Sequence, residues 1–463
     1  MRAAAPRTGL GMVGATLAVA SAVLIVGLAV AGLFGHGGSP YVGIFAYLVL
    51  PGVFVLGLLL IPLGAWLERR RVARGEGHPL PVFDLNDPRT RRRLVVIAGL
   101  TAVNLLIVGF ATYQGVHVME SPQFCGSCHS VMAPEFTAYQ RSPHARVACA
   151  ECHIGPGAPW FVKSKLSGAW QVVSVTFDLY QKPIPSPVHA LRPARETCEA
   201  CHWPAKFHGD RLEVKTIFAE DAPSTEKKTV LLLHVGGAEN EVGPPRGIHA
   251  HVAPGVTVRY LSDPERKTIH TVESVYPDGR TRLFTTAESP KVRPPPEAWR
   301  TMDCVDCHNR ASHQFRQPGP EVDLALASGR IDRTLPFVKR EAVKALRTEY
   351  PSHEAAQAGI EEALLAFYRA EDPAAFPARE PKVRAAAAAL AQIHAWNVWP
   401  SMRISWGTYP SLRGHEDAPG CFRCHDESHA TAEGVTISQD CDLCHAVLAQ
   451  EEVNPKVLGA LRP

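Results

Sequence analysis

Long apolar runs dominate the first quarter of the chain. Residues 8 to 67 contain no Asp, Glu, Lys or Arg, and only the polar stretch GHGGSP at 35 to 40 interrupts them. Each of the two resulting segments is long enough to cross a hydrocarbon layer of about 30 Å as a helix. A third apolar run, LVVIAGLTAVNLLIVGFATY, occupies residues 94 to 113. The pattern therefore predicts a membrane anchor of three transmembrane helices at 1–113, and so a protein held in a lipid bilayer.

The distribution of arginines predicts the orientation of this anchor. Residues 68 to 93 carry eight arginines, whereas the connection between the first two runs carries neither Lys nor Arg. Because cytoplasmic loops carry the excess of positive charge, residues 68 to 93 are expected in the cytoplasm, and Arg2 and Arg7 place the N-terminus there too. A cleaved signal peptide is the alternative for the first run, but its apolar core exceeds the usual length and a second span follows. Everything after Tyr113 is then expected on the opposite face.

The pattern after residue 113 changes three times. Residues 114–210 have short connections rich in Pro and Gly, without a regular period. Residues 211–300 alternate as strands do, in TVLLLHVGG, GVTVRYLS and ESVYPDGRTRLFTT, where Pro-Asp-Gly separates two strand patterns. Residues 301–463 include helical spacing between 335 and 398. We therefore expect an irregular domain at 114–210, a β-rich insertion at 211–300, and a helical segment within 301–463.

All twelve cysteines belong to one repeated motif. CxxCH, the attachment site of c-type haem, occurs six times, at Cys125/Cys128-His129, Cys149/Cys152-His153, Cys198/Cys201-His202, Cys304/Cys307-His308, Cys421/Cys424-His425 and Cys441/Cys444-His445. The thiols bind the porphyrin and the adjacent histidine ligates the iron. We expect six covalent c-type haems in a membrane-anchored multihaem cytochrome c. Its fold class would be three N-terminal transmembrane helices, then a mostly α and irregular, haem-packed periplasmic part with a small β insertion.

The expected periplasmic location agrees with this cofactor, because bacteria attach c-type haem on that side of the cytoplasmic (inner) membrane. Haem sites 1 to 3 fall in 114–210, and sites 4 to 6 fall in 301–463. Structural zinc is the alternative, since 20 residues separate Cys128 from Cys149 and 16 separate Cys424 from Cys441. The other gaps do not fit a zinc ribbon, and zinc does not require a histidine after every cysteine pair. The motif therefore favours haem.

A second set of side chains is needed on the other side of each iron. A histidine a few residues from a CxxCH motif is held near a haem edge, which favours His144, His313, His415 and His429. In GIHAHV, His249 and His251 would share one face of an extended segment, and we expect one of them, preferably His251, to be a ligand. For the first haem, Met132 is the candidate. Any single one of these histidines could instead be an ordinary surface or hydrogen-bonded residue.

The motifs resemble those of a known family. FCGSCHSVM, SPHARVACAECH, FVKSKLSG and RPARETCEACHWP occur in the order typical of the NapC/NirT family of membrane-anchored multihaem quinol dehydrogenases. GIHAHV, CVDCHNRASH and GCFRCHDESH are similar to the larger inner-membrane multihaem cytochromes of that family in metal-respiring bacteria. Two features differ: tetrahaem members have one span and four haems, and their first site usually reads CxxCHxM, whereas Met132 follows His129 by three residues.

The resemblance implies quinol oxidation at the membrane and electron delivery outside it. Lys165 falls where tetrahaem members carry a quinol-site lysine, and Lys163 and Asp178 are further candidates for the groups that orient the quinol and accept its protons. Snorkelling of the lysines to lipid phosphate is the alternative.

Two classes of function remain open at this point. The first is electron transfer from membrane quinol, or menaquinol, through six haems to a periplasmic redox protein such as another cytochrome c. The second is a terminal multihaem reductase of the nitrite or hydroxylamine type, which needs one open iron. CxxCK, which often marks such an iron, does not occur, and the supply of histidines suffices to close every site. A net charge of +3 gives no reason to expect a nucleic acid partner.

Overall fold

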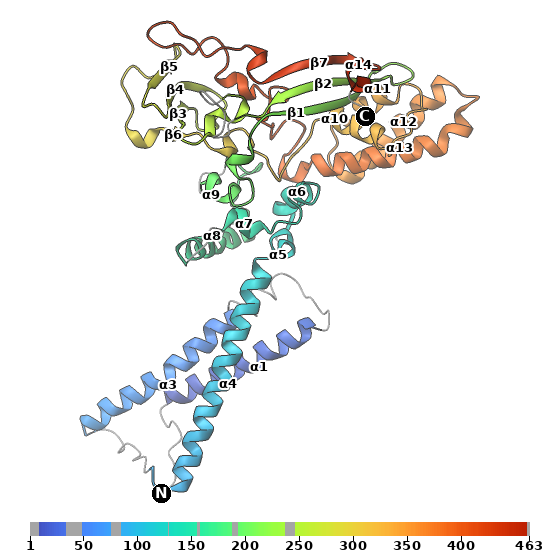
Figure 1. Cartoon of the computed structure of the whole chain (residues 1–463). Coiled ribbons are helices and arrows are strands. Elements are labelled where there is room, and N and C mark those ends of the chain that lie inside the picture. The colour runs from blue at the N-terminus through green and yellow to red at the C-terminus, as the bar shows by residue number, and fades with distance from the viewer. Residues whose placement is uncertain are drawn as a thin grey trace. The chain divides into compact units, whose positions relative to one another are not determined.

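The computed structural model describes residues 9–33, 49–75, 85–127, 129–154, 158–187, 193–236 and 246–460. The chain forms two units, Met1–His129 and Ser130–Pro463, and each is described by itself. Figure 1 colours the first unit from blue to cyan and the second from cyan to red.

The first unit contains three long apolar helices. They are α1 (Gly9–Leu33), α3 (Leu50–Ala73) and α4 (Pro88–Met119), and a short helix, α5 (Pro122–Ser127), follows them. Each of the three is long and apolar enough to cross a membrane, as the hydrophobic pattern predicts. Asp87 caps the N-terminus of α4 by accepting a hydrogen bond from the amide of Arg89, so the arginine-rich stretch forms the first turns of this helix.

Helices α1 and α3 pack closely because both carry glycine at the contact. A Cβ atom on Gly14 would lie 2.7 Å from the carbonyl oxygen of Gly57. A Cβ atom on Gly57 would lie 2.7 Å from the amide nitrogen of Ala18. Small residues allow two backbones in a membrane to approach each other, and van der Waals packing then holds the pair together.

Short helical turns carry the haem-attachment motifs of the second unit. They are α7 (Cys149–His153), α9 (Ala194–Cys198), η5 (Cys304–Asp306), η7 (Gly420–Arg423) and η8 (Cys441–Leu443). Residues three and four apart on a helical turn lie on one side of it, so such a turn brings both thiols and the histidine of CxxCH together. Two longer helices flank the second motif, α6 (His129–Gln140) and α8 (Ala158–Thr176).

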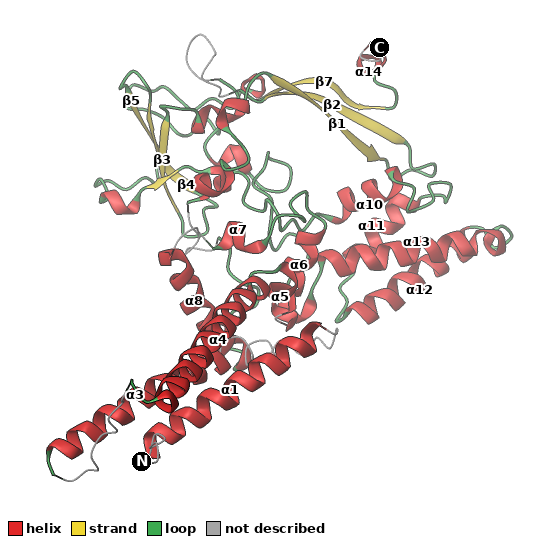
Figure 2. Cartoon of the chain, turned by 60° about the horizontal axis from the view of Figure 1, so that its bottom comes forward, coloured by secondary structure: helices red, strands yellow, loops and turns green. Residues whose placement is uncertain are grey.

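The strands form two sheets rather than one insertion. One sheet has the order β5-β4-β3-β6 and contains β3 (Thr257–Ser262), β4 (Ile269–Val275), β5 (Thr281–Thr285) and β6 (Arg300–Thr301). The other has the order β1-β2-β7 and contains β1 (Asp210–Phe218), β2 (Glu226–His234) and β7 (His445–Glu452). Figure 2 shows the two groups of strands in yellow.

The predicted strand segments 229–237, 255–262 and 272–286 correspond to β2, β3 and the β4–β5 hairpin. Strand β7 differs from the expectation, because it starts at the histidine of the last CxxCH motif and pairs with the free edge of β2. A hairpin of β1 and β2 leaves this edge open, and an open edge readily accepts another strand.

Four helices in the C-terminal half enclose the largest apolar core. They are α10 (Pro318–Ala327), α11 (Val338–Arg347), α12 (His353–Glu371) and α13 (Phe376–Asn397). Ile360, Leu364, Leu390 and Ile393 are almost completely buried between them, and Phe218 at the end of β1 joins the same core. The predicted helical spacing of 335 to 398 therefore corresponds to α11, α12 and α13. Short remaining elements are η2 (Pro204–Lys206), η3 (Ile248–Val252), η4 (Pro296–Ala298), η6 (Pro400–Met402) and α14 (Lys456–Ala460).

Candidate haem-ligand site

Five of the CxxCH histidines face a second histidine across a constant gap. The ring centres lie 5.9 to 6.5 Å apart in all five pairs. The pairs are His153 with His313 at 6.2 Å, His202 with His144 at 6.0 Å, His308 with His249 at 6.5 Å, His425 with His251 at 5.9 Å, and His445 with His415 at 6.2 Å.

This gap has the width that an iron with two imidazole ligands requires. A metal–imidazole bond is about 2 Å long and the ligating nitrogen lies about 1 Å from its ring centre, so two imidazoles on one metal have centres roughly 6 Å apart. The partners come from distant parts of the chain, as His153 and His313 do. The donor set therefore fits six-coordinate haem iron at these five motifs.

Hydrogen bonds leave one ring nitrogen available in several of these histidines. The Nδ1 of His249 donates to the carbonyl oxygen of Val235 over 3.1 Å, and that of His251 donates to Ile248 over 3.0 Å. The Nδ1 of His425 donates to the carbonyl oxygen of Ser438 over 2.8 Å. Because a carbonyl only accepts, the proton is on Nδ1 and Nε2 keeps its lone pair, which is the usual arrangement of metal-binding histidine.

Burial favours the neutral form that a metal binds. Desolvation is the first cause of a lowered pKa in six of the ten paired histidines, and in most of them the charge of a neighbouring histidine or arginine adds to it. These six are His153, His249, His251, His308, His313 and His445. A neutral imidazole can bind iron without first releasing a proton.

Some of the cysteines predicted to bind haem lie at the protein surface. A haem-packed interior would enclose these thiols, but the structure differs from that expectation at four positions that are exposed: Cys152, Cys201, Cys307 and Cys441. The reason is local, because Cys152 belongs to the five-residue helix α7 and Cys201 to the turn after α9. A single short turn covers little of its own surface with protein. The role of Cys152 and Cys201 in haem attachment therefore rests on the CxxCH motif and not on burial of their thiols.

The structure corrects the expectation for His249 and His251. Instead of an extended segment, these residues form the 3-10 helix η3. With three residues per turn, positions two apart point in clearly different directions. His249 accordingly faces His308, and His251 faces His425. Both histidines are therefore placed as ligands, of two different irons.

The structure also contradicts the ligand role expected for His429. Its side chain is buried, and both of its ring nitrogens contact oxygen acceptors. Nδ1 lies 2.9 Å from Oδ1 of Asp426, and Nε2 lies 3.1 Å from the carbonyl oxygen of Ile269. Neither nitrogen offers a lone pair, so His429 connects the loop after the fifth motif to β4.

The first motif is described only in part. Cys125 lies in α5, and Cys128 lies outside the described residues. His129 and Met132 are three positions apart in α6, which places both positions on one side of that helix. The two axial ligands of an iron lie on opposite sides of the porphyrin. Met132 can therefore serve the first iron only from the side of position 129.

A spacing near 6 Å does not by itself mark a haem. His353 and His394 have ring centres 6.1 Å apart within the helical core, but no cysteine pair precedes either residue. Nε2 of His353 donates to the carbonyl oxygen of Val398 over 2.7 Å, and His394 is buried. Burial, and then the charge of His353, lowers the pKa of His394 to about 4. These two residues are core histidines.

A buried ionic network joins the fourth and fifth motifs, and the motif pattern did not predict it. Asp306, between the two cysteines of the fourth motif, accepts hydrogen bonds from the hydroxyl of Tyr260 over 2.7 Å and from Nε of Arg300 over 2.8 Å. Arg423, between the cysteines of the fifth motif, donates to the carbonyl oxygen of Asp306 over 2.6 Å. An acidic and a basic residue inside CxxCH motifs were the available signal.

The three residues proposed for a quinol site lie in or just after α8. Lys163 places its Nζ 4.9 Å from the centre of the Trp160 ring. Lys165 is half-buried. Asp178 forms an ion pair of 2.8 Å with Lys182, and the hydrogen bond from Lys182 lowers the pKa of this exposed carboxyl. The structure thus leaves the lysines as the better candidates, since a paired carboxylate is a weaker base.

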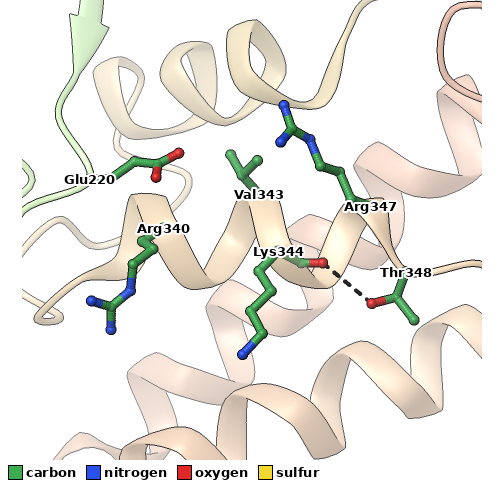
Figure 3. Close-up of a pocket in the computed structure, with 6 residues that line it drawn as sticks. All are labelled: Glu220, Arg340, Val343, Lys344, Arg347 and Thr348. Carbon is green, nitrogen blue, oxygen red and sulfur yellow. Dashed lines mark hydrogen bonds between the residues drawn. The ribbon is translucent and has the colours of Figure 1, made fainter.

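A hollow over α11 offers no convergent chemistry. Glu220, Arg340, Lys344 and Arg347 line it together with Val343 and Thr348. Figure 3 shows that Arg347 extends to a different side of the helix from Arg340 and Lys344. Among the described residues, no group of three or more His, Cys, Asp or Glu side chains is arranged to hold a metal ion such as zinc.

Apolar spanning helices followed by CxxCH motifs with paired histidines define a membrane-anchored c-type cytochrome. Residues 88–183 match the NapC/NirT cytochrome c family, N-terminal region. The chain is 40% identical over 452 residues to the cytochrome c-type protein ImcH of Geobacter sulfurreducens, a match that covers 96% of this chain and 89% of that protein. The cytochrome c-type protein TorC of Escherichia coli is 30% identical over 155 residues, which cover 28% of this chain and 38% of TorC. No solved structure matches the chain.

The chain therefore belongs to the NapC/NirT cytochrome c family of membrane-anchored multihaem cytochromes. Its three apolar helices and these relatives identify it as an inner-membrane protein.

Proposed function

We propose that this cytochrome binds six covalent haems and passes electrons from membrane quinol to a redox protein in the periplasm. The observation that carries the proposal is the set of five histidine pairs with ring centres 5.9 to 6.5 Å apart. Haem supplies a one-electron couple when bound, and two imidazole ligands close its axial positions. Sites of this kind suit electron transfer rather than reduction of a bound substrate.

Contacts between the attachment segments support one order for the relay. The thiols of Cys198 and Cys304 form a hydrogen bond, which brings the third and fourth motifs together. The thiol of Cys421 interacts electrostatically with those of Cys307 and Cys444, which links the fourth, fifth and sixth motifs.

Ligand histidines support the same order. His144 lies five residues before Cys149 of the second motif and faces His202 of the third. His249 and His251, in one short helix, face the fourth and fifth motifs. We therefore infer a route from the second haem to the sixth in sequence order, with the exposed Cys441 at its periplasmic end.

Helix α8 has the surface that a quinol site in the membrane interface needs. An exposed apolar stripe repeats at helical spacing along and just beyond it, at Val162, Leu166, Trp170, Val173 and Phe177. Such an exposed apolar face is typical of a helix that lies in the interface plane of a membrane. By helical geometry, Lys163 and Lys165 lie at the two borders of this stripe.

Quinol oxidation releases two protons with two electrons, so the site must orient the hydroxyl groups as well as accept charge. A lysine at the border of the apolar stripe can contact a quinol oxygen while the ring stays among apolar side chains. We assign this role to Lys165, with Lys163 as a second group, and leave Asp178 as the less favoured candidate because Lys182 already pairs with it.

The number and spin state of the haems test the proposal. The mass of the membrane-extracted protein should exceed that of the polypeptide by six haems. The five bis-histidine irons should be low-spin, and cyanide or nitrite should not change their spectra. A different haem count, or a cyanide-sensitive high-spin signal from more than one iron, would contradict the proposed relay.

A further inference from the structure

The second histidine pair differs from the others in its surroundings. Among the described residues, His313 is the distal histidine for which a contact with a carboxylate, that of Glu135, is found. By contrast, Nδ1 of His249 and Nδ1 of His251 donate only to backbone carbonyls. Glu135 lies in α6, the helix that begins at the histidine of the first motif.

Two atoms of Glu135 contact the same nitrogen. Nδ1 of His313 lies 3.0 Å from the backbone oxygen of Glu135 and 3.2 Å from its carboxylate Oε2. The carboxylate is largely buried, with 16% of the side chain exposed, so water screens its charge only weakly.

Arg310 holds this carboxylate in position. Its terminal nitrogen contacts both carboxylate oxygens of Glu135, at 3.1 and 3.3 Å. Its Nε donates to the backbone oxygen of His313 over 2.8 Å. The guanidinium also lies over the Tyr409 ring, 4.3 Å from its centre. The carboxylate, the arginine and the ligand histidine therefore form one rigid group.

An anionic acceptor on Nδ1 makes the imidazole a stronger donor to a metal through Nε2. Stronger donation and a nearby negative charge both stabilise ferric over ferrous iron, and so lower the reduction potential of the haem. The positive charge of Arg310 offsets part of this effect, but Arg310 contacts the carboxylate and the backbone rather than the imidazole.

We propose that Glu135 sets the reduction potential of the second haem below those of the other bis-histidine haems through its contact with Nδ1 of His313. This inference rests on the proposed function, because it takes His153 and His313 as the two axial ligands. Electrons would then collect on the third to sixth haems. Their return toward the quinol site would require an uphill step through the second haem.

The test is a redox titration of the full, membrane-extracted protein, monitored by absorption and electron paramagnetic resonance. In Glu135→Gln, the potential of one low-spin haem should rise while the others stay unchanged, and Glu135→Asp should keep most of the original value. Glu226→Gln is the matched control, because Glu226 also pairs with an arginine, Arg333, but has no histidine contact in the described structure. Unchanged potentials in Glu135→Gln would overturn the inference.

Arg310→Met provides a second measurement with the opposite sign, since it removes the compensating charge and should lower the potential of the same haem. A rise or no change would overturn the inference even if Glu135→Gln failed to accumulate. His313→Ala separates the two levels of the proposal. One iron should become high-spin in that variant, and its failure to do so would refute the ligand assignment itself.

Discussion

At the scale of single residues, each ligand histidine depends on what its second nitrogen contacts. His251 donates from Nδ1 to its own short helix and leaves Nε2 for iron, whereas His429 has both nitrogens engaged. Both residues belong to the same type and lie near the fifth motif. Their hydrogen bonds, rather than their distance from CxxCH in the sequence, separate the ligand from the structural residue.

Variants of these two histidines should behave differently. His251→Ala should convert one haem to a high-spin form that binds cyanide, because the iron loses one axial ligand. Magnetic circular dichroism in the near infrared would measure the fraction converted. His429→Ala is the control and should leave every iron low-spin, although it removes a buried group. A high-spin signal of similar size in His429→Ala would contradict the assignment.

Lys165 is expected to affect quinol oxidation and not haem binding. In Lys165→Ala, reduction by a menaquinol analogue should slow at least about tenfold, the loss that corresponds to roughly 1.4 kcal/mol of transition-state stabilisation. Stopped-flow absorption of the haems would measure the rate. Dithionite should still reduce all six haems, and Lys291→Ala, at an exposed lysine outside α8, should react like the unmodified protein. An unchanged rate in Lys165→Ala would exclude this quinol site.

The buried His394 should make the helical core sensitive to acid. Burial lowers the pKa of His394 to about 4 from an unperturbed 6.5. Above pH 6.5 the residue is neutral in both the folded and unfolded states. As the pH falls from 6.5 to 4, the unfolded state takes up the proton first, and the core should lose up to about 3 kcal/mol of stability. Hydrogen exchange of α13 amides would report this loss, and His394→Leu should show a smaller dependence on pH.

At the scale of elements, the contact between α1 and α3 depends on the absence of two side chains. Gly57→Leu should separate the helices, because even a Cβ at this position would lie 2.7 Å from backbone atoms of α1. Overpacking of this kind costs about 1 to 3 kcal/mol. Thermal unfolding in detergent would measure the loss. Gly52→Leu in the same helix is the control, since no atom lies within 4 Å of its added Cβ, and equal effects of both variants would contradict the packing argument.

At the scale of the whole molecule, the direction of the membrane anchor decides where the haems are. The arginines between the second and third spans predict that a reporter fused after Arg74 is cytoplasmic and that one fused after Pro463 is periplasmic. Alkaline phosphatase, which is active only outside the cytoplasm, and a fluorescent protein that folds only inside it would read out both positions. The opposite location of either reporter would contradict the proposed orientation and, with it, attachment of haem to the exported part.

The sequence by itself predicted every feature that depends on a few neighbouring residues. Three apolar runs are long enough to span a membrane wherever they occur, and α1, α3 and α4 correspond to them. Both cysteines and the histidine of CxxCH lie within one helical turn, so the motif alone identifies an attachment site. The strand segments and the helical spacing of residues 335 to 398 are local patterns too, and the structure confirms them.

Only the tertiary structure decided which residues meet across longer distances. His153 pairs with His313, 160 positions later, and no local pattern specifies that partner. The form of GIHAHV depends on packing, so a period-two expectation chose between His249 and His251 where η3 uses both. The edge of β2 receives β7 from the far end of the chain for the same reason. Local geometry fixes one ligand of each iron, whereas the opposite ligand, and the charge that Glu135 places beside it, come from packing between segments far apart in the sequence.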